Sequence, residues 1–362
     1  MNKIIYLDSA ATYQKPKIVI ESQVEFLRDG YANAGRGICA RSVGVDDMVG
    51  RVRQRVADFM GANAGQIVFT SGTTGAMNMI AGMLGLGNDK IVLVSDLDHH
   101  SARLPFVTGL AKTIVMPLNT ELDIDINQIP YADVMVITAM SNVLGVGQNV
   151  PEIVRMARIQ NPNVVVVVDA AQYVVHEKID VKKWDADFVV WSAHKIGADT
   201  GLGLMYVKNP DKYKPVIFGG GMVNKIAGGQ VFFVPGPEKF EAGTLPLTQI
   251  AGLGVAIDEL EKNRPDLNLI KYMYDQLSEA PRIKMLTKRD AAVLTFVIDG
   301  MHVLDFGAFV SARDICVRVG NMCASWIHNV MGVTGSIRLS VGASNTMDEV
   351  KYVVQVIKDI IK

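Results

Sequence analysis

The hydrophobic positions of this chain gather in short runs of β-branched and other apolar residues, separated by longer amphipathic segments. Five of these runs have the length of a strand: Gln66–Thr70, Lys90–Val94, Val134–Thr138, Val164–Val168 and Phe188–Trp191. Alternation of strand-length and helix-length segments is typical of an α/β protein whose parallel sheet is covered by helices. We therefore predict an α/β fold with a mostly parallel central sheet.

The run Val164–Val168 consists of five valines without polar alternation. This pattern indicates a central strand that is buried on both faces. Asp169 follows directly, at the expected carboxyl end of the strand. Because ligands of open α/β sheets bind outside the carboxyl ends of the strands, polar residues in such places are the first candidates for chemistry.

The pattern becomes shorter and more mixed towards the C-terminus. The segment Leu253–Lys262 predicts a connecting helix, and the sequence Thr346-Met347-Asp348-Glu349 predicts a capping box that opens a final amphipathic helix. The chain is too long for one minimal domain. We expect a large domain formed by residues 15–260 and a smaller α+β domain formed by residues 1–14 and 261–362.

The amino-acid composition restricts the classes of partner that the protein could bind and the cellular compartment that would suit it. The 362 residues carry 36 Lys and Arg against 37 Asp and Glu, so the net charge of -1 offers no basic field for nucleic acid or an anionic membrane. No apolar run has membrane-spanning length, and the apolar stretch before Asp8 is too short for a signal peptide. Three cysteines argue against a disulfide framework and favour a reducing compartment, by default the cytoplasm. Two of them, Cys39 and Cys316, are interpreted as small buried hydrophobic side chains.

A lysine follows the last of the five predicted strands. The sequence Ser192-Ala193-His194-Lys195 precedes a glycine-rich segment, which predicts a tight turn near a site. A lysine amine becomes a nucleophile only when it is placed and activated, and an ordinary surface lysine is the more frequent explanation for Lys195 alone. Asp169, with Gln172 on the same turn, could pair with a pyridinium nitrogen and keep a cofactor ring able to accept electrons. The alternative for Asp169 is a helix cap.

Two further segments follow predicted strands. The sequence Ser71-Gly72-Thr73-Thr74-Gly75 could wrap a phosphate with backbone N–H groups at a helix N-terminus, although an ordinary turn is the more frequent explanation. It is neither a P-loop nor a dinucleotide fingerprint. Either imidazole of His99-His100 could stack on an aromatic ring or move protons. The six histidines and three cysteines nowhere show paired ligand spacing, so we expect no metal site.

The last candidate segment runs from Arg318 to Cys323 and is followed by Arg338. A thiolate can attack sulfur, and a guanidinium group can bind a carboxylate through two hydrogen bonds. A cysteine considered by itself is more often a small, buried hydrophobic residue, and this is the alternative interpretation of Cys323.

Together and in this order, these segments resemble the class V aminotransferase family of fold-type I pyridoxal-phosphate enzymes, and within it the cysteine desulfurases closest to selenocysteine lyases. The nearly full-length resemblance rests on the segments Tyr6–Ala11, Arg36–Ile38, Gly72–Thr74, Asp98–His100, Ser141–Gly145, Asp169–Gln172, Ser192–Lys195, Phe240–Thr244 and Cys323–Arg338. Each motif is weak, but the ordered set is specific. It implies a fold-type I transferase with a large and a small domain, and pyridoxal 5'-phosphate as the cofactor.

The resemblance also implies roles for single residues. Lys195 would carry the cofactor, Asp169 would hold its pyridine nitrogen, Gln172 would bond its ring oxygen, and His99 would stack on its ring. Other groups that would hold the cofactor, chiefly its phosphate, are those of Thr73, Thr74, Asn142, Ser192 and His194 and, from the neighbouring subunit of a homodimer, Thr244. Arg338 with Asn142 would bind the substrate carboxylate, while Arg36 and Arg318 would line the entrance.

The activity implied is that of a cysteine desulfurase, which converts L-cysteine to L-alanine. Lys195, His99 and Cys323 would be catalytic, with the sulfur held on Cys323 as a persulfide. The short cysteine loop resembles the type that passes sulfur to a separate acceptor protein, as in iron-sulfur cluster assembly.

Three departures from the family pattern keep other functions open. Asn321-Met322 replaces the usual pair of histidines before the cysteine, Ala324-Ser325-Trp326 follows it in place of Ala-Gln/Met-Pro, and Gly75 replaces a glutamate. Imidazoles beside Cys323 would lower the pKa of its thiol. The alternatives are another class V enzyme, namely a selenocysteine lyase, β-lyase, aminotransferase or epimerase, and a cofactor-bearing subunit without activity in iron-sulfur assembly.

Overall fold

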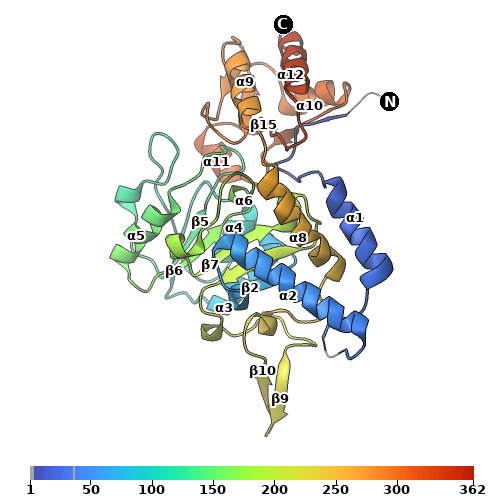
Figure 1. The fold of residues 1–362 in the computed structure, drawn as a ribbon. Helices are drawn as coiled ribbons and strands as arrows, with labels where there is room; N and C mark the ends of the chain where they lie inside the picture. Colours follow the sequence, from blue (N-terminus) through green and yellow to red (C-terminus); the bar gives the residue numbers. More distant parts are fainter. Residues whose placement is uncertain (1–3, 36) are drawn as a thin grey trace.

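A seven-stranded sheet forms the centre of the computed structural model, which describes residues 4–35 and 37–362 (Figure 1). Its spatial order is β2 (Ile67–Thr70), β8 (Gly203–Val207), β7 (Phe188–Ser192), β6 (Val165–Asp169), β5 (Val134–Thr138), β3 (Ile91–Val94) and β4 (Lys112–Val115). Among the described strands of this sheet, β8 alone runs opposite to the direction that the other strands share, and it lies antiparallel between β2 and β7. The predicted α/β fold with a mostly parallel sheet is therefore confirmed.

All five predicted strands are present, as β2, β3, β5, β6 and β7, with ends within one residue of the predicted ones. Two strands of the sheet, β4 and β8, were not predicted. The edge strand β4 has no fully buried residue, so its pattern resembles a surface segment. The strand β8 begins at Gly203, a residue type that favours turns in sequence patterns.

Helices cover both faces of the sheet, and β6 shows how its valines are divided between them. Val166 and Val168 pack in one apolar cluster, whereas Val167 packs in another on the opposite face. The first face is covered by α2 (Ala40–Met60), α5 (Val150–Gln160) and α8 (Leu247–Lys262), and the second by α3 (Thr73–Leu84) and α4 (His100–Val107). This two-sided burial explains the run of five valines, since each buried side chain contributes about 1.5–3 kcal/mol.

The predicted helix Leu253–Lys262 is the second part of α8, which begins six residues earlier, at Leu247. The helix α1 (Lys17–Glu25), extended by a π-helical turn at Phe26–Gly30, packs against α8. Shorter elements of this part of the chain are α6 (Tyr173–His176) and α7 (Val181–Trp184). The hairpin of β9 (Val223–Ala227) and β10 (Gln230–Phe233) projects away from the sheet at the bottom of Figure 1.

The elements after α8 build a second, smaller layer at the top of Figure 1. Its four strands are β11 (Ile283–Met285), β12 (Leu294–Ile298), β15 (Ser336–Leu339) and β14 (Arg318–Gly320), and its helices are α9 (Asn268–Leu277), α10 (Val303–Ser311) and α12 (Met347–Ile360). The N-terminal strand β1 (Ile5–Tyr6) joins this layer by pairing with β13 (Ile315–Cys316). These residues share an apolar cluster of their own, which supports the proposed division into two domains.

The predicted capping box opens α12. The Thr346 hydroxyl accepts a hydrogen bond from the Glu349 backbone N–H at 3.3 Å, and the Glu349 carboxylate accepts one from the Thr346 N–H at 3.1 Å. The two reciprocal bonds satisfy N–H groups that have no partner within the helix. The prediction of this final helix is confirmed.

One C-terminal segment packs away from its sequence neighbours. The helix α11 (Ser325–Val330) lies between β14 and β15 along the chain. Ala324 and Ile327 are nevertheless completely buried in the apolar cluster of the large sheet that also contains residues of α2, α5 and α8. The loop that carries Cys323 is therefore fixed to the large sheet rather than to the C-terminal strands.

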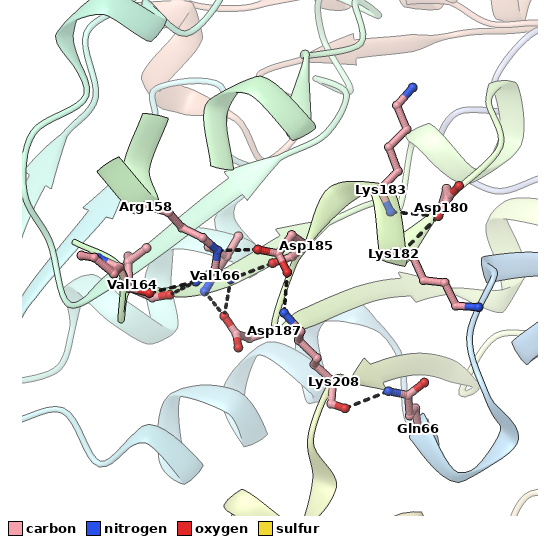
Figure 2. Close-up of polar contacts among 11 residues, drawn as sticks. Gln66, Arg158, Val164, Val166, Asp180, Lys182, Lys183, Asp185, Asp187 and Lys208 are labelled. Carbon is pink, nitrogen blue, oxygen red and sulfur yellow. Dashed lines mark hydrogen bonds and ion pairs between the residues drawn. The ribbon is translucent and has the colours of Figure 1, made fainter. Parts of the chain in front are cut away.

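The edge of the sheet at the amino ends of β6 and β7 is filled by charged pairs (Figure 2). The Arg158 guanidinium contacts the carboxylates of Asp185 and Asp187, and Lys208 pairs with Asp185. Asp187 also accepts a hydrogen bond from the Val166 N–H at 2.9 Å. These contacts join strand ends at the edge of the sheet opposite to Asp169. We therefore interpret the amino edge as structural and search for the active site at the carboxyl edge.

The cysteines correct one interpretation. Cys39 is exposed at the N-cap of α2, not buried, and hydrogen bonds from Ser42 lower the pKa of its thiol. Cys316 is half-buried, and burial raises the pKa of its thiol. Across residues 4–35 and 37–362, no helix has both the length and the apolar character needed to cross a membrane.

Candidate active site

The carboxyl ends of the central strands surround a cavity of about 270 Å³. It is lined by Ala11, Thr73, Thr74, His99, Ser101, Met140, Asn142, Asp169, Ala171, Gln172, Ser192, His194 and Lys195. This set includes every residue expected to hold the cofactor except Thr244. Segments far apart in the sequence are joined here because parallel strands place their carboxyl ends at one edge of the sheet.

Lys195 lies in a 3₁₀ turn, Ala193–Ile196, that follows β7 directly. Its Nζ donates a hydrogen bond to the Ala10 carbonyl oxygen at 2.6 Å. Burial, together with the positive charge of Arg338, lowers the pKa of Lys195 to about 8. A lysine with this pKa is partly neutral near neutral pH, which a nucleophilic amine requires.

Asp169 is the last residue of β6 and is almost completely buried. One of its carboxylate oxygens accepts a hydrogen bond from the Ala171 N–H at 2.9 Å. Burial raises the pKa of Asp169 to about 6, against the effects of that hydrogen bond and of Lys195. The carboxylate is thus costly to ionise alone and would be stabilised by a cationic group bound in the cavity.

The side-chain amide of Gln172 lacks partners among the described residues. Both its Nε2 and its Oε1 are buried, and neither has a hydrogen-bond partner among the described residues. Buried polar groups in proteins are almost always paired, and an unpaired one costs about 1–3 kcal/mol. The amide therefore fits a polar ligand that fills the cavity beside Asp169.

The phosphate-binding candidates lie at the N-terminus of α3. The Thr73 N–H and hydroxyl both lie 2.9 Å from the Ser192 hydroxyl, which joins this helix to the end of β7. A side chain at Gly203 would come within 2.4 Å of the backbone of Gly72, so the close approach needs glycine there. Positive partial charge at the helix N-terminus suits an anion. His194 lies at the same place, with its Nδ1 3.1 Å from the Thr12 hydroxyl.

His99 is the N-cap residue of α4. Its Nδ1 accepts a hydrogen bond from the Ser101 N–H at 3.2 Å and lies 2.7 Å from the Ser101 hydroxyl. Burial and the nearby charge of Lys195 lower the pKa of His99 to about 4. The ring is therefore neutral at physiological pH and suits stacking on another flat ring.

Two arginines of the C-terminal layer share one carboxylate. Asp8 accepts hydrogen bonds from Arg338 at 3.2 Å and from Arg318 at 2.5 Å. Arg338 also donates to the backbone oxygen of Asn142 at 2.8 Å, at the wall of the cavity. Asp8 belongs to one of the family motifs, but its role could not be predicted from the sequence because its partners lie more than 300 residues away.

Cys323 does not line the cavity, and its side chain is exposed. The Asn142 side chain, in the cavity wall, nevertheless donates to the carbonyl of the preceding Met322 at 2.9 Å, and the N–H of His100, next to the lining residue His99, donates to the Cys323 carbonyl at 2.8 Å. The loop therefore lies at the border of the cavity, next to His99.

Thr244 does not line the cavity around Lys195. It lines a separate cavity of about 550 Å³ together with Arg53 and Glu241. Arg36 lies outside the described residues. Within the described part of the chain, no group of three or more His, Cys, Asp or Glu side chains could hold a metal ion.

The fold of the chain and the residues that line the cavity agree with the protein family that the sequence matches. The model of the class-V aminotransferase family matches residues 5–353, so the chain belongs to this family of pyridoxal-phosphate-dependent enzymes. Among its relatives, a probable cysteine desulfurase of Vibrio cholerae serotype O1 is 32% identical over 381 residues, which cover 98% of this chain and 93% of the relative.

Two solved structures resemble the whole fold. The apo structure of a cysteine desulfurase from Thermococcus onnurineus NA1 has a TM-score of 0.93 at 29% identity, covering 99% of this chain and 95% of that one. The cysteine desulfurase CsdA of Escherichia coli, in an S-sulfonic acid form, has a TM-score of 0.90 at 29% identity, with 98% and 94% covered.

The cavity fits pyridoxal phosphate on the evidence of its own residues. A buried lysine with a lowered pKa, a buried carboxylate, an unpaired amide and a helix N-terminus meet around one space. These groups match, in turn, the aldehyde, the ring nitrogen, the ring oxygen and the phosphate of the cofactor.

Proposed function

We propose that this protein is a pyridoxal-phosphate-dependent cysteine desulfurase that converts L-cysteine to L-alanine and transfers the sulfur through Cys323. The observation that carries the proposal is the attachment of the turn at Met322 and Cys323 to the cavity that contains Lys195, through Asn142 in the cavity wall and through His100 beside it. The names of the relatives described above support the same reaction.

Pyridoxal phosphate, when bound, supplies an electron-withdrawing ring that weakens the bonds at the α-carbon of an attached amino acid. Asp169 would hold the proton of the pyridine nitrogen, and Gln172 would hydrogen-bond the ring oxygen. The neutral His99 ring would stack on the cofactor. Thr73, Thr74, Ser192 and His194 would bind the phosphate, because all four line the cavity near the N-terminus of α3.

Lys195 would carry the cofactor and, once displaced by the substrate amine, move the proton of the substrate α-carbon at its Nζ. A pKa of about 8 keeps a fraction of this amine neutral and able to take that proton. Arg338, at the wall formed by Asn142, would bind the substrate carboxylate.

Cys323 would then attack the sulfur of the substrate as a thiolate. The new S–S bond makes a persulfide on Cys323, while the bond between the substrate β-carbon and sulfur breaks with its electrons going to carbon. That carbon takes up a proton and leaves as the methyl group of alanine. The sulfur is oxidised and the carbon reduced within one step, so no external oxidant is required.

The proposal includes two protein partners. A second copy of the chain would complete the site, with Thr244 reaching the phosphate in its neighbour and Arg318 and Arg36 near the entrance. The separate location of Thr244 supports this, as do the exposed apolar side chains of Ile20, Val24 and Leu27 along α1 and the turn after it. The exposed thiol of Cys323 supports a separate sulfur-acceptor protein, and a reducing compartment such as the cytoplasm would keep it free.

The test uses purified, cofactor-loaded protein with L-cysteine and a reducing thiol. Alanine and sulfide are quantified for the native chain, for Cys323→Ser and for Cys39→Ser, which changes another exposed cysteine. We expect both products from the native chain and Cys39→Ser, and neither from Cys323→Ser. Sulfide from Cys323→Ser at the native rate would refute the role of the thiol. A keto acid in place of alanine would identify transamination instead.

A further inference from the structure

The backbone at Cys323 has an unusual conformation. Met322 and Cys323 have φ angles of 51° and 53°, so two consecutive residues with side chains occupy the left-handed region. This region is unfavourable for residues other than glycine, and it persists only where surrounding contacts hold it. Contacts around Met322 and Cys323 must therefore stabilise this turn.

Three polar contacts hold the turn from both sides. The Met322 and Cys323 carbonyls accept from Asn142 and His100, as described above, and the Asn321 side chain accepts from the Cys323 N–H at 3.2 Å. Ser325 adds a fourth contact, with its hydroxyl 3.2 Å from the Nε2 of His100.

An aromatic residue fixes the far side of the loop. The Trp326 ring meets the His100 ring edge-on, with centroids 5.1 Å apart and planes at 82°. The guanidinium carbon of Arg103 lies 4.2 Å from the centre of the same indole ring, and Asp96 holds that guanidinium at 2.8 Å. The indole is thus clamped between two side chains of α4, the helix whose N-cap is His99.

We propose that Trp326, clamped between His100 and Arg103, is a positioning residue that holds the strained Cys323 turn against the cavity in the geometry for sulfur transfer. The inference rests on the proposed desulfurase function and concerns the same site. It assigns a role to a residue where this chain departs from its family pattern: an aromatic anchor stabilises a loop that lacks the usual histidines. The edge-on imidazole and the cation over the indole face each favour this docked arrangement.

The test compares Trp326→Ala and Trp326→Leu, which remove the ring, with Trp326→Phe, which keeps one. Tyr352→Ala, at an exposed tyrosine of α12, is the matched control. Two quantities are measured on cofactor-loaded protein: kcat and KM for L-cysteine, and the hydrogen exchange of the His100 amide. That amide reports docking directly, because its acceptor is the Cys323 carbonyl.

We expect Trp326→Ala and Trp326→Leu to exchange the His100 amide about tenfold faster, since aromatic and cation–π contacts of this kind have that order of effect. We expect kcat to fall about tenfold or more with KM within about twofold, because a displaced nucleophile affects the chemical step. Trp326→Phe should recover much of both, and Tyr352→Ala should match the native chain.

If Trp326→Leu has the same kcat as the native chain, the proposal is overturned, whether or not the exchange of the His100 amide changes. Unchanged exchange in that variant would also overturn it. If the native chain produces no alanine, the desulfurase function fails, while the exchange of the His100 amide still decides whether Trp326 holds the loop. Trp326→Leu fills the site with an apolar side chain, so the test does not depend on the folding of Trp326→Ala.

Discussion

The buried ion pair beside Thr244 gives a sharp prediction about stability. Arg53 donates two hydrogen bonds to Glu241, at 2.6 and 2.8 Å, and Glu241 also accepts from the Phe69 N–H at 2.7 Å. Arg53 donates as well to the carbonyl of Ile67 at 2.7 Å. Both charged side chains are almost fully buried. The pair thus joins α2, β2 and the segment that leads to Thr244.

The substitution Glu241→Gln keeps an acceptor for the Phe69 N–H but leaves the Arg53 charge buried without a counter-charge. Breaking a buried pair from one side costs about 3–5 kcal/mol. Adding Arg53→Met removes the uncompensated charge, so we expect the double variant to be more stable than Glu241→Gln by about 2 kcal/mol. A second substitution in the same contact should therefore restore stability.

The assay is urea unfolding of the cofactor-loaded protein, followed by tryptophan fluorescence. Two of the three tryptophans, Trp184 and Trp191, are buried in the apolar cluster that includes α2, so most of the signal reports this region. The change in midpoint multiplied by the m-value gives the difference in free energy of unfolding. Glu152→Ala, which removes the half-buried partner of the exposed Arg155, is the control and should cost no more than about 1 kcal/mol. A double variant less stable than Glu241→Gln would refute the reasoning.

Three other outcomes follow from the site. The pKa of Lys195 is about 8 in the folded, cofactor-free chain against 10.5 for the free side chain, so the unfolded state binds more protons between these pH values. Stability should therefore rise from pH 8 to 10.5 more in the native chain than in Lys195→Met, as measured by urea midpoints; equal slopes would contradict this. Gly203→Ala should destabilise the chain by about 1–3 kcal/mol and weaken cofactor binding, measured by fluorescence titration, because its Cβ would overlap the backbone of Gly72. Iodoacetamide should label Cys39 before Cys316 in a mass-spectrometric time course, since the thiolate is the reactive form; the reverse order would be inconsistent with their pKa shifts.

The sequence predicted the central sheet well because its buried strands carry uninterrupted apolar runs. The convergence of Asp169 and Lys195 could also be predicted, since both follow strands that run in the same direction. Neither β4 nor β8 could be found in this way, because one lies exposed at the edge and the other begins with glycine.

What the sequence could not predict depends on contacts between distant segments. The pairing of Asp8 with Arg318 and Arg338 joins the two ends of the chain, and no local pattern records it. The prediction that Cys39 is buried was wrong: it rested on the usual burial of cysteines, whereas the place of Cys39 before a helix in a polar stretch was the available signal of exposure. The clamp around Trp326 likewise depends on side chains of α4, more than 200 residues earlier.

The packing of Ala324 and Ile327 under the large sheet has a consequence for substrate-linked motion. Arg338 lies on β15 in the C-terminal layer, whereas the Cys323 turn is anchored on the other body by its neighbours. A displacement of the C-terminal layer relative to the large sheet would move Arg338, which we propose to bind the substrate carboxylate, and would leave the Cys323 turn in place. The two side chains proposed to act on opposite ends of the substrate are thus held in place by separate apolar clusters.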